Sequence, residues 1–138
     1  MTTALSQTFH NPEALFNPSP YGFSHVAVVP GGSKLIFVAG QGGEENKEGK
    51  LSPEFRIQVQ HALNNIKIAL QTQQLSMKSV VKVTTLVVNH DAEKLNIIID
   101  EFKKIWPANQ FPVNTLIPVP RLALDNMQVE IDAVAITK

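Results

Sequence analysis

The sequence predicts an α+β fold, in which a single sheet of order ββαβαββ carries two helices on one face. Residues 79–88 are a nearly continuous run of β-forming side chains, which is typical of a central strand buried on both faces. Two segments, 53–70 and 91–106, repeat apolar side chains at helical spacing. The last segment, 128–137, alternates its side chains with the period of a strand. Together these features predict one domain that spans residues 1–138.

The first part of the chain is expected to form a surface leader followed by a hairpin. Residues 1–20 contain two asparagine–proline pairs, which favour turns and extended backbone. Residues 23–29 and 34–39 both have the composition of strands, and Pro30-Gly31-Gly32 between them is a turn sequence. We therefore expect these two strands to pair with each other.

Each predicted helix has a start signal. Ser52 is the expected N-cap of the first helix, with Pro53 at its first helical position. Asp91 can cap the second helix, and Pro107 stops it. One apolar stripe on each helix is expected to cover the sheet. The stripe of the first helix consists of Phe55, Val59, Ala62, Leu63, Ile66 and Leu70.

Two prolines restrict the fourth strand, residues 114–122. Pro118 and Pro120 are two positions apart, so the N–H donors that they lack would all point to one side of the strand. That side is not suited to a regular ladder in the middle of a sheet. We expect an edge strand, or a strand that lies against another subunit without regular ladder bonds.

The last strand carries two acids on an otherwise apolar background. One face combines Glu130 and Asp132 with Val134 and Ile136. A carboxylate beside apolar surface tends towards a raised pKa and can exchange protons near neutral pH. The alternative is that both acids lie at the hydrated end of a half-covered sheet and only keep the protein soluble. This strand alone favours the alternative.

Apolar side chains on the second face of the sheet predict an oligomer. Two helices can cover one face only, and five aliphatic residues of the predicted strands indicate that the other face is apolar as well. An exposed apolar patch of that size usually marks an interface, so we expect a homo-oligomer that packs sheets together. The residues in question are Val81, Val83, Val87, Val134 and Ile136.

The composition excludes several classes of protein. Twelve basic residues balance twelve acidic ones, which gives no net attraction for nucleic acid or for an anionic membrane. No apolar run approaches the roughly 20 residues that span a bilayer. The chain has no cysteine, so disulfides, thiol catalysis and zinc–thiolate sites are all excluded. A soluble cytoplasmic protein is the simplest interpretation.

The sequence gives no motif for a metal or phosphate site. The four histidines, His10, His25, His61 and His90, share no ligand spacing, so no metal site is expected. The glycine-rich segment 40–43 lacks the Gly-Lys-Ser/Thr ending of a phosphate loop. We interpret it as a flexible connection.

Several short segments, in order along nearly the whole chain, resemble the YjgF/RidA family, also called the reactive-intermediate deaminase or L-PSP endoribonuclease family. The segments are residues 17–21, 36–41, 60–66, 79–85, 111–112 and 129–135. The resemblance implies a chorismate-mutase-like α+β fold and a homotrimer with ligand clefts between subunits. It also implies a small-molecule ligand and hydrolysis of imine or enamine intermediates without a metal or organic cofactor.

Four residues match positions of the family's cleft. By this resemblance Tyr21 is the cleft tyrosine, and Gly40 is the glycine whose N–H faces a ligand. Asn96 matches a cleft asparagine. Glu130 matches the glutamate that positions the attacking water. The resemblance therefore assigns the catalytic role to Glu130 and substrate binding to the other three.

Three positions depart from the family pattern. Ala39 replaces a serine, Leu116 replaces a small residue or cysteine, and Asn114 replaces the arginine that binds the substrate carboxylate. An amide offers one neutral hydrogen bond in place of a charged pair, which should cost about ten- to a hundredfold in affinity. Arg121 lies about 23 Å along the same strand from Asn114, so it could serve only from a neighbouring subunit.

Three hypotheses for function follow. The first is an enzyme that hydrolyses a small imine or enamine, with Asn114 selecting a ligand that lacks the usual carboxylate or binds it weakly. The second is a binding or regulatory trimer without catalysis, since the arginine and serine are absent. The third, a ribonuclease, is disfavoured by the neutral net charge.

Overall fold

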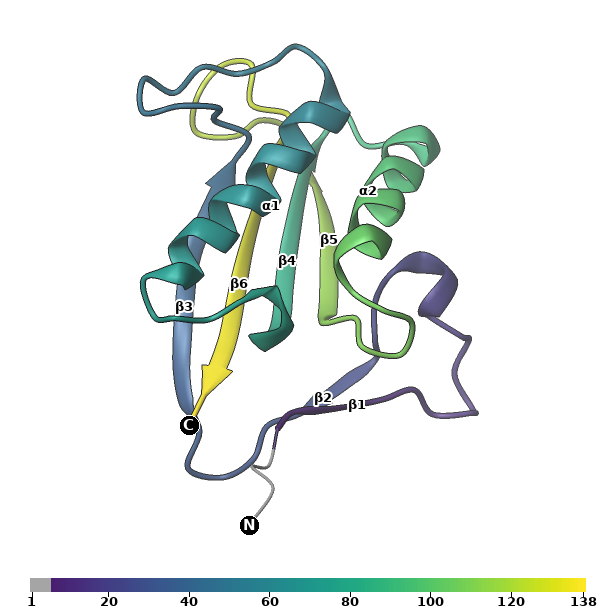
Figure 1. The fold of residues 1–138 in the computed structure, drawn as a ribbon. Helices are drawn as coiled ribbons and strands as arrows, with labels where there is room; N and C mark the ends of the chain where they lie inside the picture. Colours follow the sequence, from purple (N-terminus) through teal and green to yellow (C-terminus); the bar gives the residue numbers. More distant parts are fainter. Residues whose placement is uncertain (1–5) are drawn as a thin grey trace.

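Four long strands form one mixed sheet, and two helices lie on one of its faces (Figure 1). The computed structural model describes residues 6–138, so the first five residues of the predicted leader lie outside the described residues. The sheet order is β3-β6-β4-β5, with parallel pairing between β4 and β5 and antiparallel pairing elsewhere. The predicted α+β fold with both helices on one face is confirmed. The elements are β1 (Thr8–His10), the short 3-10 turn η1 (Ser19–Tyr21), β2 (Val26–Val28), β3 (Lys34–Gly42), α1 (Phe55–Gln71), η2 (Met77–Ser79), β4 (Val80–Val88), α2 (Ala92–Ile105), β5 (Val113–Val119) and β6 (Val129–Thr137).

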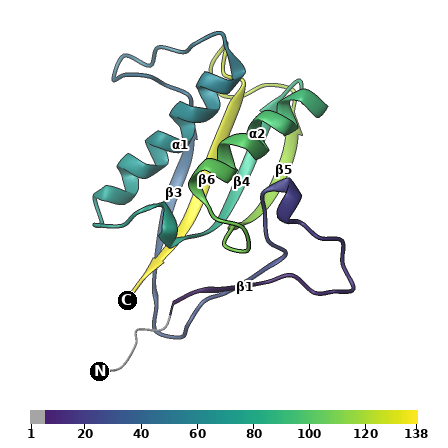
Figure 2. The same cartoon turned by 45° about the vertical axis from the view of Figure 1, so that its right-hand side comes forward.

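The predicted hairpin between the first two strands is wrong. β2 pairs with β1, from Thr8↔Val28 to His10↔Val26, and the two make a separate small sheet below the main one (Figure 2). The Pro30–Ser33 turn does form, with the Ser33 N–H donating to the Pro30 carbonyl at 3.3 Å. It leads β2 away from β3 because the leader supplies a closer partner. A three-residue strand is too short to give a periodic signal.

Helix α1 begins later than predicted. Its N-cap is Glu54, and the Ser52 hydroxyl accepts only a local bond from the Glu54 N–H at 3.1 Å. The reason is Gln58, whose buried side chain donates to the Ser52 carbonyl at 2.7 Å. That carbonyl is therefore not available to the helix, and the first helical bond joins Gln58 N–H to Glu54.

Helix α2 has the predicted ends. Asp91 is the N-cap, and its carboxylate accepts a bond from the Lys94 N–H at 2.8 Å. The helix ends at Ile105, before Pro107. Trp106 follows as a buried residue, and its indole N–H donates to the Met77 carbonyl at 2.9 Å.

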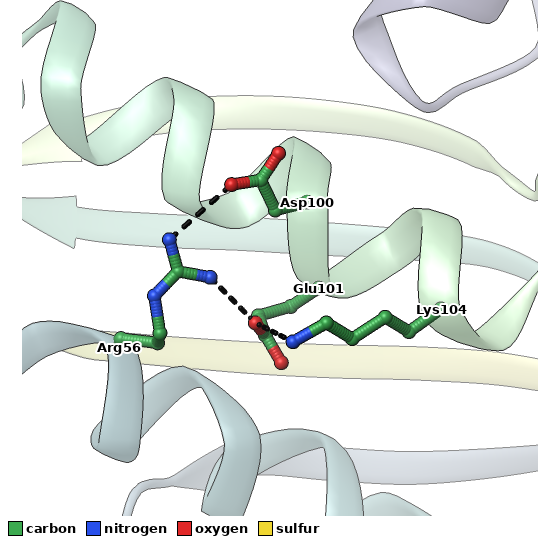
Figure 3. A network of polar contacts seen from close by, with 4 residues as sticks. All are labelled: Arg56, Asp100, Glu101 and Lys104. Carbon is green, nitrogen blue, oxygen red and sulfur yellow. Dashed lines mark hydrogen bonds and ion pairs between the residues drawn. The ribbon is translucent and has the colours of Figure 1, made fainter.

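An ion-pair network joins the two helices on their outer side (Figure 3). Glu101 of α2 is only 4% exposed, yet its carboxylate accepts bonds from Arg56 of α1 at 2.7 Å and from Lys104 at 2.8 Å. Burial alone would raise the pKa of the Glu101 carboxyl, but the hydrogen bonds from Lys104 and Arg56 outweigh burial and hold the pKa below its ordinary value. Asp100 binds the same guanidinium from an exposed position at 3.2 Å.

The core lies between the helices and the covered face of the sheet. Its fully buried side chains come from both helices and from the two central strands. Two of the valines that were predicted to make the second face apolar, Val83 and Val87, belong to this core instead. A register shift in β4 between Val80 and Lys82 changes which residues face the helices, so an unbroken alternation from Val81 assigns the wrong face.

The second face of the sheet, which we call the open face, is covered by neither helix. Phe37 of β3 is 73% exposed there, and Leu35 and Ile117 are also exposed. β5 lies at one edge of the sheet, as predicted from Pro118 and Pro120, and β3 lies at the other edge. The open face therefore exposes large apolar side chains to solvent.

Candidate functional site

One cluster of candidate residues lies on the open face. Strand pairing sets Glu130 beside Leu86 and sets Asp132 beside Thr84, so all four side chains share this face. Together with Gly40 they line a small cavity of about 210 Å³. We call this set, Gly40, Thr84, Leu86, Glu130 and Asp132, the Glu130 cluster.

Gly40 is the residue that lets the Glu130 carboxylate approach the backbone. The β3–β6 register shifts between Val38 and Gln41, which places Gly40 in an irregular part of the strand. A Cβ at this position would lie 2.6 Å from Glu130 Oε1, which is closer than any real contact allows. Only glycine therefore leaves room for this carboxylate.

The two acids of the Glu130 cluster differ in their bonding. Asp132 Oδ1 accepts a hydrogen bond from the Thr84 N–H at 2.8 Å, so this carboxylate is held by the sheet itself. Within residues 6–138, Glu130 has no such donor, and its oxygens are free to bind water or a ligand. Glu130 is therefore the better candidate for binding water or a ligand, whereas Asp132 is held in place by its bond to the sheet backbone.

A second cluster lines a cavity of about 710 Å³ on the helix side of the sheet. We call it the aromatic cavity, because three aromatic rings contribute to its wall. Its lining residues come from the N-terminal segment, from α2 and from β5. They are Phe16, Asn17, Pro20, Tyr21, Phe23, Leu95, Ile98, Asn114 and Leu116.

The loop that carries Tyr21 is fixed against α2. Residues 19–21 form the short turn η1, and the next residue, Gly22, has a positive φ of 75°. A Cβ on Gly22 would meet Phe102 of α2 at 3.6 Å, so the loop packs closely on the helix. Tyr21 itself is 51% exposed beside the cavity.

Asn114 has a partner that the sequence did not reveal. The Thr85 hydroxyl of β4 donates to Asn114 Oδ1 at 3.0 Å, and Thr85 is fully buried. The pair forms because Asn114 is registered with Val83, two residues from Thr85 on the same face of the sheet. The polar side chain of Thr85 within a run of valines was the available signal.

Phe16 is the centre of an aromatic group that sequence reasoning also missed. Its ring makes edge-to-face contacts with Tyr21, Phe23 and His25 at centroid distances of 5.9, 6.0 and 5.0 Å. His25 Nε2 lies 2.8 Å from the Phe16 carbonyl, so this histidine helps to hold the segment that carries Phe16.

The two clusters lie on opposite faces of the sheet. Asn114 and Leu116 are registered with Val83 and Thr85, which are buried under the helices. Glu130 is registered with Leu86 on the open face. Hence the structure brings Gly40 together with Glu130, and Tyr21 together with Asn114, but the sheet separates the two pairs within one chain.

The remaining candidate residues lie outside both clusters. Asn96 is exposed on α2 and lines neither cavity. Arg121 pairs with Asp125 at 3.2 Å beside a different cavity, so within its own chain it does not replace the missing arginine. In the described part of the chain no three acidic or histidine side chains gather to hold a metal ion, and none of the helices there has the length and apolar composition of a membrane span.

The fold and the two clusters define a small α+β protein with an open sheet face and two separated half-sites. Residues 17–137 match the family model described as Endoribonuclease L-PSP. The chain therefore belongs to the YjgF/RidA family.

Individual relatives agree with this assignment. YyfB from Yersinia pestis, a protein of unknown function in the conserved Rid family, is 30% identical and has a TM-score of 0.88, with 95% of this chain and 98% of that chain covered. A RutC family protein of Buchnera aphidicola subsp. Schizaphis graminum is 27% identical over 88% of this chain and 92% of its own length. Escherichia coli TdcF, solved with bound serine, is 24% identical with a TM-score of 0.66 over 80% of this chain and 85% of its own, and shows the shared fold alone.

Proposed function

We propose that this protein hydrolyses a small imine or enamine metabolite in a cleft between the subunits of a homotrimer. Family membership supports a role with a small metabolite. The observation that carries the proposal is the contact between Gly40 and the free Glu130 carboxylate on the open face. A carboxylate held against backbone and without an internal partner is suited to orient a water molecule.

The separation of the two half-sites is the reason to place the cleft between subunits. A second copy that covers the open face would bury Phe37, Leu35 and Ile117, which are exposed in one chain. Rotational symmetry would then let the Glu130 cluster of one copy meet the aromatic cavity of the next. Each cleft would combine Glu130 with Tyr21 and Asn114 across the interface.

The reaction requires little from the protein beyond positioning and charge. Glu130 accepts a proton from water as the water oxygen bonds to the carbon of the C=N group. Glu130 passes that proton to the nitrogen, and the hydroxyl proton of the resulting carbinolamine follows. The C–N bond then breaks as the C=O bond forms, which releases a carbonyl compound and ammonia. The backbone N–H of Gly40 would stabilise charge that develops on the substrate.

Escherichia coli TdcF, which shares this fold, was solved with bound serine, so the fold is compatible with a small-molecule ligand. The replacement of the family arginine by Asn114 argues that the substrate of this chain differs in charge.

The test is ammonia release from 2-iminobutyrate-type acids and from uncharged imines. We expect wild-type protein to release ammonia faster than buffer, and Glu130→Gln to lose at least about a hundredfold of that rate. Glu48→Gln, which changes an exposed acid in the β3–α1 loop, is the matched control and should keep full activity. Equal, near-background rates for wild type and Glu130→Gln on every substrate would exclude the reaction.

A non-catalytic trimer that binds a small metabolite is the second candidate. The observation that favours it is the absence of the family arginine and serine at Asn114 and Ala39. In this case a ligand would be recovered chemically unchanged after long incubation with the protein. An endoribonuclease is the least supported function, because equal numbers of basic and acidic residues give the chain no net attraction for RNA.

A further inference from the structure

We propose that the part of the ligand held in the aromatic cavity is uncharged and apolar, and that it presents a hydrogen-bond acceptor to the Asn114 amide. The inference rests on the proposed function for the location of the site, and it adds the chemical class of the ligand. It follows from the charges, the hydrogen bonding and the shape of the cavity.

The aromatic cavity contains no charged side chain among its described lining residues. Its polar groups are the amides of Asn17 and Asn114 and the hydroxyl of Tyr21. All other lining residues are aromatic, aliphatic or proline. A carboxylate placed here would lose its hydration and gain no opposite charge, which is unfavourable.

The Glu130 cluster, which would complete the cleft from the neighbouring copy, is acidic. Its two charged members are Glu130 and Asp132. Lys82 is the cation next to this cluster, but it is exposed, and its ammonium bonds the Thr84 hydroxyl at 3.5 Å without lining the cavity. An anionic ligand would therefore face two like charges, whereas a neutral ligand would not.

Thr85 fixes the hydrogen-bonding character of Asn114. Because the buried Thr85 hydroxyl donates to Asn114 Oδ1, one acceptor position of the amide oxygen is occupied and the amide is held with its nitrogen on the other side. The N–H groups of Asn114 Nδ2 are then the ones left to bind a ligand. Asn114 thus acts as a donor, and Thr85 is a positioning residue that sets its orientation.

The wall of the cavity suits a flat apolar group. Phe16 is 61% exposed, and its ring is held edge-on by Tyr21 and Phe23. Leu95 and Leu116 supply aliphatic surface elsewhere in the lining. Aromatic and aliphatic surface of this kind favours a ring or branched chain over a hydrated polar group.

A matched pair of probes, benzamide and benzoate, tests the ligand class directly because the two have nearly the same shape and differ in charge. Their dissociation constants would be measured on the intact protein at neutral pH by calorimetry or NMR. We expect benzamide to bind wild type at least about tenfold more tightly than benzoate. Asn114→Arg should reverse the preference, and Asn64→Arg, at an exposed position of α1, should leave it unchanged.

Two variants of Thr85 separate positioning from folding. Thr85→Val keeps the shape but removes the donor to Asn114, so benzamide should bind about three- to tenfold more weakly while benzoate binding stays the same. Thr85→Ser keeps the hydroxyl and should retain the wild-type ratio of the two constants. Thermal unfolding of each variant checks that the fold is intact.

Benzoate binding as tightly as benzamide, or no binding of either probe at millimolar concentration, would overturn the inference. These binding outcomes do not depend on turnover. A neutral-selective cavity without ammonia release would remove the proposed reaction alone, whereas rapid hydrolysis of carboxylate-bearing imines with tight benzoate binding would remove the ligand class alone.

Discussion

The covered face and the open face of the same sheet differ in almost every respect. Residues that alternate along one strand, such as Ile131 and Glu130, face the packed core and the uncovered surface respectively. The covered face buries most of its side chains in the core, while the open face exposes Phe37 and carries Glu130 and Asp132. The comparison teaches that strand alternation places packed core side chains and the acids Glu130 and Asp132 on opposite faces of one sheet.

Truncating a core side chain should give the largest effect on stability. Phe102 of α2 is buried and makes an edge-to-face contact with Trp106 at a centroid distance of 5.3 Å. Phe102→Ala should lower the free energy of unfolding by about 3–5 kcal/mol, measured by urea denaturation. Ile68→Ala, on the exposed side of α1, should change it by less than about 0.5 kcal/mol. Equal effects of the two variants would break the comparison between buried and exposed positions.

Removing the charge of Glu101 should have a smaller but pH-dependent effect. Glu101→Gln should lower the free energy of unfolding at neutral pH by about 1.5–3 kcal/mol, because the bonds from Arg56 and Lys104 then go to a neutral oxygen. Asp100→Asn changes the exposed partner of the same arginine and should cost less than about 1 kcal/mol.

The sign of the pH dependence follows from the lowered pKa of Glu101. The stabilisation is complete above the ordinary pKa of 4.5 and is lost as the pH falls through the lower pKa of the folded state. The difference between wild type and Glu101→Gln should therefore shrink in acid. A difference that stays constant as the carboxyl is protonated would contradict the assignment.

Gly43 and Gly40 both lie close to another residue, but Gly43 faces backbone and Gly40 faces the Glu130 side chain. A Cβ at Gly43 would lie 2.6 Å from the Cα of Gln58, which is backbone, so Gly43→Ala should cost about 1–3 kcal/mol of stability. A Cβ at Gly40 would meet the side chain of Glu130 from Cγ to Oε1 but no backbone atom, so Gly40→Ala should cost less stability than Gly43→Ala, by about 1 kcal/mol or more.

For the rate of hydrolysis, Gly40→Ala should have the larger effect of the two variants. Gly40→Ala displaces the Glu130 carboxylate and should lower hydrolysis by about a hundredfold. Gly43→Ala should leave hydrolysis largely intact at temperatures where the variant is folded. Denaturation and ammonia-release assays on the two purified variants provide both readouts, and parallel losses in the two assays would remove the distinction.

Local chemistry made much of the fold predictable. The cap at Asp91, the stop before Pro107 and the edge position of β5 all follow from residues that act on their immediate neighbours. The contact of Gly40 with Glu130 joins two residues that the family resemblance had singled out.

Features that depend on distant partners were not predictable from single segments. The strand predicted at residues 23–29, which is β2, pairs with β1 because residues 8–10 of the leader offer a strand edge. Ser52 is not the N-cap because its carbonyl accepts a bond from the Gln58 side chain. Thr85 acquires a role only through the β4–β5 register. Asn96 was assigned from the resemblance alone, and its position on α2 adjoins neither cavity.

The central claim is that copies of this chain meet on the open face of the sheet. Sedimentation equilibrium of wild type and of Phe37→Asp tests it most directly, since Phe37 is the most exposed large apolar side chain of that face. The account predicts a wild-type particle of three times the mass of one chain, and a single folded chain for Phe37→Asp. A wild-type protein that sediments as one chain, or a Phe37→Asp variant that remains a trimer, would contradict it.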